Sequence, residues 1–72
     1  MEGFWKATNI SGEIYGVFKV EKTRSWYRTY RYQNGDWVRD DDVFYEFGWN
    51  DDYDDISEEE AKAIMKAMDH AE

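Results

Sequence analysis

The stretch SWYRTYRYQNGDWVR, residues 25–39, determines the fold class. Its first part is dense in Trp, Tyr and Thr, whose side chains suit a pleated, half-buried surface. Asn34-Gly35 follows directly, and this dipeptide is the strongest short-range signal for a hairpin, because a type I′ turn needs positive φ at both central residues. With these two residues as the turn, the predicted facing pairs are Tyr32 with Trp37 and Tyr30 with Arg39.

Further strands are predicted on both sides of this hairpin. Residues 13–20 alternate between apolar and polar side chains, which is the period of a half-buried strand. Asn9 and Gly12 predict a turn that leads back to a first strand over residues 3–8. A last strand is expected over residues 43–47. The predicted core face of the strand over residues 13–20 consists of Ile14, Phe18 and Val20, with Glu13, Tyr15, Val17 and Lys19 on the other face.

The C-terminal part of the sequence predicts a helix over residues 58–70. Ser57 and Glu60 form a capping box, in which each side chain bonds an unpaired backbone N–H of the first turn. Apolar residues then recur at helical spacing, namely Ala61, Ile64, Met65 and Met68. We therefore expect a single α+β domain over residues 1–72, a small antiparallel sheet of three to five strands with one C-terminal helix packed on one face.

The composition excludes several classes of protein. A net charge of −8 and a mean hydropathy of −0.99 are typical of disorder, but four Trp, six Tyr and four Phe in 72 residues supply the bulk of a small core. Because the chain has no Cys, disulfides, thiolate zinc sites and cysteine nucleophiles are excluded. No apolar run has the length of a signal peptide or membrane span, so we expect a cytoplasmic protein.

Charge is polarised along the chain. Residues 1–33 carry a net charge of +3 and residues 34–72 a net charge of −11. Residues 40–60 contain eleven acidic side chains and no basic one, and aromatic residues are interleaved with them. An acidic tail that served solubility alone would lack these aromatics.

Enzymatic and metal-binding functions are disfavoured by the residue types. The only histidine is His70, close to the C-terminus, so no catalytic triad is predicted. A calcium loop beginning at Asn50 would place Asp55 where glycine is needed and Ala61 where a bidentate glutamate is needed. We therefore predict no catalytic residues, no metal site and no cofactor.

The favoured hypothesis is a protein that binds another protein by imitating DNA. Closely spaced carboxylates on a folded domain resemble a phosphate backbone, and Trp or Tyr side chains anchor an interface that charge alone would only steer. The expected partner is a protein with a basic nucleic-acid-binding groove. We expect no direct binding to nucleic acid and no binding to a membrane. The predicted partner-binding residues are Asp40, Asp41, Asp42, Glu46, Trp49, Asp51, Asp52, Tyr53, Asp54 and Asp55.

Two alternatives remain open. In one, the acidic residues only solubilise a small phage or bacterial accessory protein, whose aromatic sheet face binds the partner. In the other, a basic edge binds single-stranded nucleic acid by stacking and phosphate contacts. That edge would consist of Lys19, Arg24, Arg28 and Arg31 with Trp26 and Tyr27.

Residues 48–55, GWNDDYDD, lead into three consecutive Glu residues before the helix. This segment resembles an acidic segment in a family of small phage-encoded anti-CRISPR proteins that inhibit Cas9. The resemblance implies an acidic face that mimics DNA and blocks the site that reads the short motif beside a target. It also implies that Asp51, Asp52, Asp54 and Asp55 pair with basic residues of the partner, with Tyr53 or Trp49 as an apolar anchor.

Overall fold

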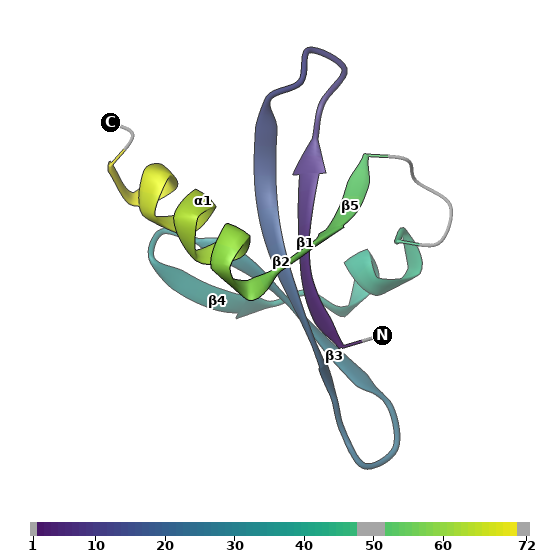
Figure 1. Cartoon of the computed structure of the whole chain (residues 1–72). Helices are drawn as coiled ribbons and strands as arrows, with labels where there is room; N and C mark the ends of the chain where they lie inside the picture. Colours follow the sequence, from purple (N-terminus) through teal and green to yellow (C-terminus); the bar gives the residue numbers. More distant parts are fainter. Residues whose placement is uncertain (1, 48–51, 71–72) are drawn as a thin grey trace.

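The structure is a computed structural model and describes residues 2–47 and 52–70. Its strands form one antiparallel five-stranded sheet in the order β4-β3-β2-β1-β5, followed by one C-terminal helix (Figure 1). The predicted α+β class is therefore confirmed. The elements are β1 (Gly3–Thr8), β2 (Ile14–Lys22), β3 (Tyr27–Gln33), β4 (Asp36–Arg39), the 3-10 helix η1 (Asp41–Tyr45), β5 (Tyr53–Ile56) and α1 (Glu58–His70).

The hairpin of β3 and β4 has the predicted turn and register. Asn34 has φ of 52° and Gly35 has φ of 84°, as a turn with two residues of positive φ requires. Tyr32 faces Trp37 and Tyr30 faces Arg39. The rings of Tyr32 and Trp37 meet edge to face with centroids 5.3 Å apart, so the hairpin also contributes an aromatic pair to the core.

The prediction of a strand over residues 43–47 is wrong. Residues 41–45 form η1 instead, and the fifth strand is β5, which pairs with β1 at the opposite edge of the sheet from β4. Val43 on η1 and Phe47, just beyond its end, are both buried in the same cluster. Residues 40–47 thus lie against one face of the sheet.

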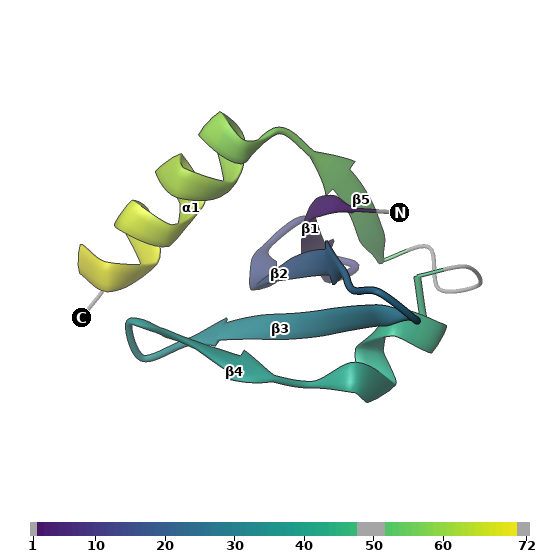
Figure 2. The ribbon, with the colours of Figure 1, turned by 90° about the horizontal axis from the view of Figure 1, so that it is seen from below.

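Both faces of the sheet are covered. On one face α1 packs over a cluster that contains Val17, Tyr32, Ile56 and Ala61. On the other face η1 covers a second cluster, which contains Ala7, Phe18, Val20, Val43 and Phe47. Figure 2 shows α1 and the teal η1 turn on different sides of the twisted sheet.

The burial of β2 differs at two positions from that of the predicted half-buried strand, although Val17 lies on the predicted face, opposite Phe18 and Val20. Val17 was expected on the polar face but is completely buried, whereas Ile14 is 40% exposed. The expected alternation assumed that one face of the sheet meets water. Because α1 and η1 cover opposite faces, consecutive residues of β2 are buried on different sides.

The helix α1 starts at the predicted residue with one of the two predicted capping-box bonds, whereas the Glu60 carboxylate, expected to bond the Ser57 N–H, pairs with Lys6 at 3.2 Å. The backbone N–H of Glu60 donates to the Ser57 hydroxyl at 3.1 Å, and the N–H of Ala61 donates to the Ser57 carbonyl at 3.0 Å. Ala61 is fully buried, and Ile64, Met65 and Met68 pack against the same cluster. Within the described part of the chain, no helix has the length and apolar character needed to cross a membrane.

Candidate functional site

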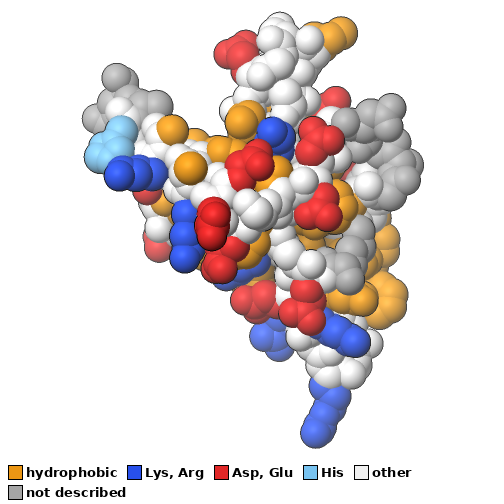
Figure 3. Space-filling model, viewed as in Figure 1, with side chains coloured by type: hydrophobic (Ala, Val, Ile, Leu, Met, Phe, Trp, Pro, Cys, Tyr) orange, Lys and Arg blue, Asp and Glu red, His pale blue; other side chains and the backbone are white. Residues whose placement is uncertain are grey.

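The acidic segment predicted to bind a partner separates into two parts in space. Residues 40–47 lie under one face of the sheet with η1, and residues 52–60 run along the sheet edge into α1. Trp49 and Asp51, which belong to the predicted site, lie outside the described residues. Figure 3 shows acidic side chains spread over this view of the molecule with basic side chains among them, so the charge is not a single uninterrupted band.

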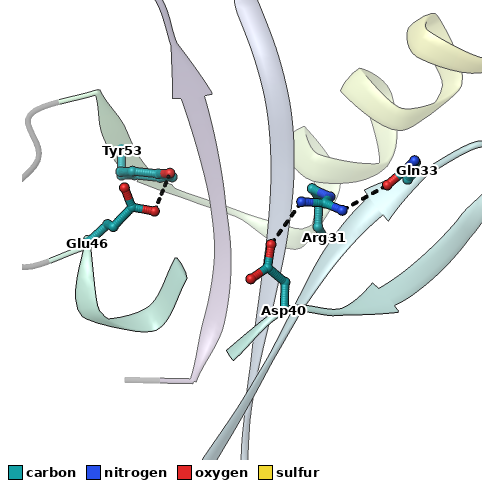
Figure 4. Close-up of polar contacts among 5 residues, drawn as sticks. All are labelled: Arg31, Gln33, Asp40, Glu46 and Tyr53. Atoms are coloured by element: carbon teal, nitrogen blue, oxygen red, sulfur yellow. Dashed lines mark hydrogen bonds and ion pairs between the residues drawn. The ribbon is translucent and has the colours of Figure 1, made fainter. Parts of the chain in front are cut away.

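Two acidic residues next to η1 make contacts within the chain. Asp40 accepts from the Arg31 guanidinium at 2.9 Å, and Arg31 also donates to the Gln33 side chain at 3.0 Å (Figure 4). Asp41 accepts from Arg39 at 2.7 Å and from the backbone N–H of Thr29 at 3.2 Å. These contacts connect η1 to β3 and β4.

The environment of Asp41 favours its charged form. The hydrogen bond from the Arg39 guanidinium lowers the pKa of the Asp41 carboxyl, and the bond from the Thr29 N–H lowers it further. The adjacent Asp42 is exposed, and no ion pair of this residue occurs among the described residues. The two neighbouring carboxylates therefore differ in role, because Asp41 stabilises the fold and Asp42 lies at the surface.

Tyr53, predicted as an apolar anchor, belongs largely to the core. Its ring meets those of Phe18 and Phe47 edge to face, with centroids 5.4 and 5.1 Å away. Its hydroxyl donates to Glu46 at 3.3 Å (Figure 4). Burial, together with the negative charge of Glu46, raises the pKa of Tyr53 to about 12. Glu46 thereby links the end of η1 to β5.

The remaining acidic residues form a surface that we call the acidic rim, defined as Asp52, Asp54, Asp55, Glu58, Glu59 and Glu60. All six are exposed. They are held by regular structure, because Asp54 and Asp55 lie on β5 and the three Glu residues form the first turn of α1. Carboxylates favour a helix N-terminus, where the backbone dipole is positive.

Contacts within the chain partly neutralise the acidic rim. Glu60 pairs with Lys6 at 3.2 Å and Glu58 pairs with Lys62 at 3.8 Å. Asp52 accepts a hydrogen bond from the Tyr15 hydroxyl at 3.3 Å. Six carboxylates with two lysines leave the rim strongly negative.

Sequence reasoning missed one feature, an aromatic pocket between the β2–β3 turn and η1, with a volume of about 320 Å³. Trp26 and Tyr45 line this pocket and are 57% and 64% exposed, which is high for side chains of this size. The sequence did mark Trp26 and Tyr27 as aromatics beside basic residues. It gave no sign that the chain brings η1 next to them. The aromatic lining consists of Trp26, Tyr27, Phe44 and Tyr45, and the charged lining of Arg28, Arg39 and Asp41.

Residues that suit catalysis or metal binding are not grouped. Over residues 2–47 and 52–70, no three His, Cys, Asp or Glu side chains come together in a way that would hold a metal ion. His70 is exposed on the last turn of α1. Comparisons of the chain with protein-family models, with curated proteins and with solved structures found no match.

Proposed function

We propose that this chain is a non-enzymatic inhibitor that binds, through the acidic rim, the basic nucleic-acid-binding groove of another protein. In this proposal it acts in the cytoplasm of the cell that contains the partner, as anti-CRISPR and anti-restriction proteins do. The observation that carries the proposal is the placement of exposed carboxylates at successive positions of an edge strand and of the helix that follows it.

The spacing of the carboxylates on the rim supports imitation of DNA. A strand rises about 3.3 Å per residue, so the Asp52–Asp55 segment extends over roughly 10 Å. One strand of DNA carries one negative charge per 3.4 Å along the helix axis. Asp52, Asp54 and Asp55 place three charges along this length, with Asp54 on one side of β5 and Asp55 on the other, so the edge strand as a whole approaches the charge density of a single DNA strand.

The rigidity of this part of the chain supports the same proposal. β5 pairs with β1 through four residues, from Phe4 opposite Ile56 to Ala7 opposite Tyr53. Ile56 is buried, which fixes the junction between β5 and α1. A surface that is already ordered loses less conformational entropy on binding than a disordered acidic tail does.

The first experiment asks whether DNA and this chain compete. The chain is immobilised, proteins from an extract of host cells are bound to it, and a DNA duplex is added to displace them. A partner whose groove is occupied by the rim is displaced by the duplex and is itself a nucleic-acid-binding protein. Its affinity for the chain falls as salt rises, because exposed charges are screened.

The second experiment neutralises the rim. Asp52, Asp54 and Asp55 are changed together to Asn, and binding to the displaced partner is measured at low salt. At up to about 1 kcal/mol per exposed charge contact, the triple variant loses as much as about 3 kcal/mol of binding free energy. A single substitution has a smaller effect, since the attraction is distributed over the rim.

A matched control removes three charges elsewhere on the surface. Glu2, Glu13 and Asp36 are exposed and lie outside the rim, so their combined change to Gln, Gln and Asn leaves partner binding close to that of the unmodified chain. Equal binding by the folded rim variant and the wild type refutes the proposal. So does a complex in which the partner holds the duplex and this chain at the same time.

The packing of the sheet reduces the aromatic surface on which a partner could dock in the alternative function. α1 and η1 cover the two faces of the sheet, so most sheet aromatics are buried or partly buried in the two clusters, although Tyr15 on β2 is 51% exposed. Trp26 and Tyr45 remain exposed at the pocket beside η1. A partner bound there by apolar contacts would show little salt dependence, and the rim variant would bind it normally.

A further inference from the structure

Four aromatic rings form one connected wall in the pocket beside η1. Phe44 lies at the centre, stacked on Tyr27 with ring centroids 5.2 Å apart and planes 21° apart. The ring centroid of Trp26 lies 5.9 Å from that of Phe44, and the Tyr45 ring meets Phe44 edge to face with centroids 5.7 Å apart. The wall therefore joins the end of the β2–β3 turn to η1.

The exposed ring of Trp26 is held by its backbone. The N–H of Trp26 donates to the Thr23 hydroxyl at 3.0 Å, and the carbonyl of Trp26 accepts from the Thr23 N–H and hydroxyl, both at 2.7 Å. Since none of these bonds uses the indole, the turn does not depend on the Trp26 side chain. A large apolar ring presented in this way offers a stacking surface to a ligand.

The pocket is positively charged in a protein that is strongly negative. Arg28 and Arg39 line it together with one acid, Asp41, and Asp41 is already bonded to Arg39. No ion pair involves Arg28 among the described residues. The end of β2 and the turn after it carry the exposed Lys22 and Arg24, and basic side chains gather at the lower tip of the molecule in Figure 3.

This charge distribution decides between two kinds of ligand. An aromatic pocket with an acid often binds a cation, but here Asp41 is already paired with Arg39, and the remaining guanidinium of Arg28 would repel a cation. Flat aromatic rings beside arginines suit a nucleobase with its phosphate, the combination that single-stranded nucleic acids offer. The volume of about 320 Å³ is at the small end for ligand pockets and therefore suits one nucleotide unit better than a long peptide segment.

We propose that the pocket formed by Trp26, Tyr27, Phe44 and Tyr45 binds a nucleotide unit of single-stranded nucleic acid. The base stacks on the exposed face of Trp26, and the Arg28 guanidinium binds the adjacent phosphate. This function is separate from that of the acidic rim and does not depend on it. One chain would then use different surfaces for a protein and for a nucleic acid.

The test uses a fluorescein-labelled oligothymidylate of ten nucleotides and the 72-residue chain, with binding followed by fluorescence anisotropy in 0.1 M salt. At this ionic strength the repulsion from the distant acidic residues is screened beyond about 10 Å. The wild type raises the anisotropy. Trp26→Ala weakens binding at least fivefold, because stacking of one base is worth about 1–3 kcal/mol. Trp26→Phe keeps part of the stacking and binds with intermediate affinity.

Charge is tested with a matched pair of variants. Arg28→Gln weakens binding and reduces its dependence on salt, since one phosphate contact is lost. Lys66→Gln removes the same charge from α1, away from the pocket, and leaves the affinity within twofold of the wild type. Circular dichroism and melting temperature verify that each variant is folded.

Four results overturn the proposal. The wild type fails to bind the oligonucleotide at 1 mM protein, or folded Trp26→Ala binds as the wild type does, or Lys66→Gln loses as much affinity as Arg28→Gln. An acidic tyrosine-containing peptide that binds more tightly than the oligonucleotide, and that Trp26→Ala abolishes, also overturns it and assigns the pocket to a protein partner. None of these results bears on the acidic rim, because its variants leave the pocket unchanged.

Discussion

The Tyr32 hydroxyl donates to the Asp69 carboxylate, 2.7 Å from Oδ1 and 2.8 Å from Oδ2. Tyr32 lies on β3 and Asp69 on the last turn of α1, so this contact connects the end of the helix to the sheet. The bond to Asp69 is the main reason why the pKa of Tyr32 is raised.

Removal of this hydroxyl should loosen the end of α1. Tyr32→Phe keeps the ring packing with Trp37 but lowers the melting temperature, and amide exchange over residues 66–70 becomes faster. Asp69→Asn has a smaller effect, since its amide oxygen still accepts the bond. Unchanged exchange at the end of α1 in Tyr32→Phe would show that the contact has no structural role.

Asp41 and Asp42 form a matched pair for the role of η1 in stability. The pKa of Asp41 is lowered in the folded protein, so its contribution to stability is present above the ordinary pKa of about 4 and is lost as pH falls through the lower folded value. Asp41→Asn is therefore less stable than wild type at pH 7, and the difference shrinks toward pH 2. Asp42→Asn has the same charge change and little effect. Urea unfolding at several pH values distinguishes the two, and equal behaviour would contradict the assignment.

Thr29 offers a site for stabilisation. It is completely buried, and its hydroxyl oxygen has no hydrogen-bond partner among the described residues. Thr29→Val replaces this hydroxyl with a methyl group of similar size and raises the free energy of unfolding by about 1 kcal/mol, because an unsatisfied buried group is removed. Thr29→Ser keeps the hydroxyl, loses the methyl group and destabilises the protein. A less stable Thr29→Val would mean that the hydroxyl is satisfied in solution.

Gly35 tests the hairpin turn. Its φ of 84° is accessible to glycine and poorly accessible to a β-branched residue. Gly35→Val costs about 1–3 kcal/mol of folding free energy, whereas Gly35→Asn costs less because Asn tolerates positive φ. Thermal unfolding of both variants is the measurement. Equal melting temperatures would contradict this turn geometry.

Local signals made the hairpin and the helix predictable. Asn34-Gly35 and the Ser57 cap each specify a backbone conformation through residues close in sequence. The 3-10 helix η1 was not predicted. Val43 and Phe47 are buried in one cluster, and this is evident only when the surface that they cover is known. The burial of Val17 was missed for the same reason, since α1 and η1 meet the sheet only in the folded protein.

The candidate site was predictable only in part. The density of acidic residues in 40–60 identified the rim, because charge is read directly from sequence. The contact of Asp40 with Arg31 depends on the register of β3 and on the position of η1, and neither is encoded locally. The aromatic pocket likewise requires Phe44 beside Tyr27, which are distant in sequence.

The position of β5 at the end of the sheet has a consequence for solubility. An edge strand exposes backbone groups on which a second molecule can add a strand, and unprotected edges lead to aggregation. On β1, Lys6 lies opposite Asp54 and Trp5 lies opposite Asp55. Because successive side chains of a strand alternate, Asp54 and Asp55 point to opposite sides of β5. A second copy approaching this edge would therefore meet like charge above and below the sheet. The carboxylates that we assign to recognition of a partner also keep β5 from pairing with itself.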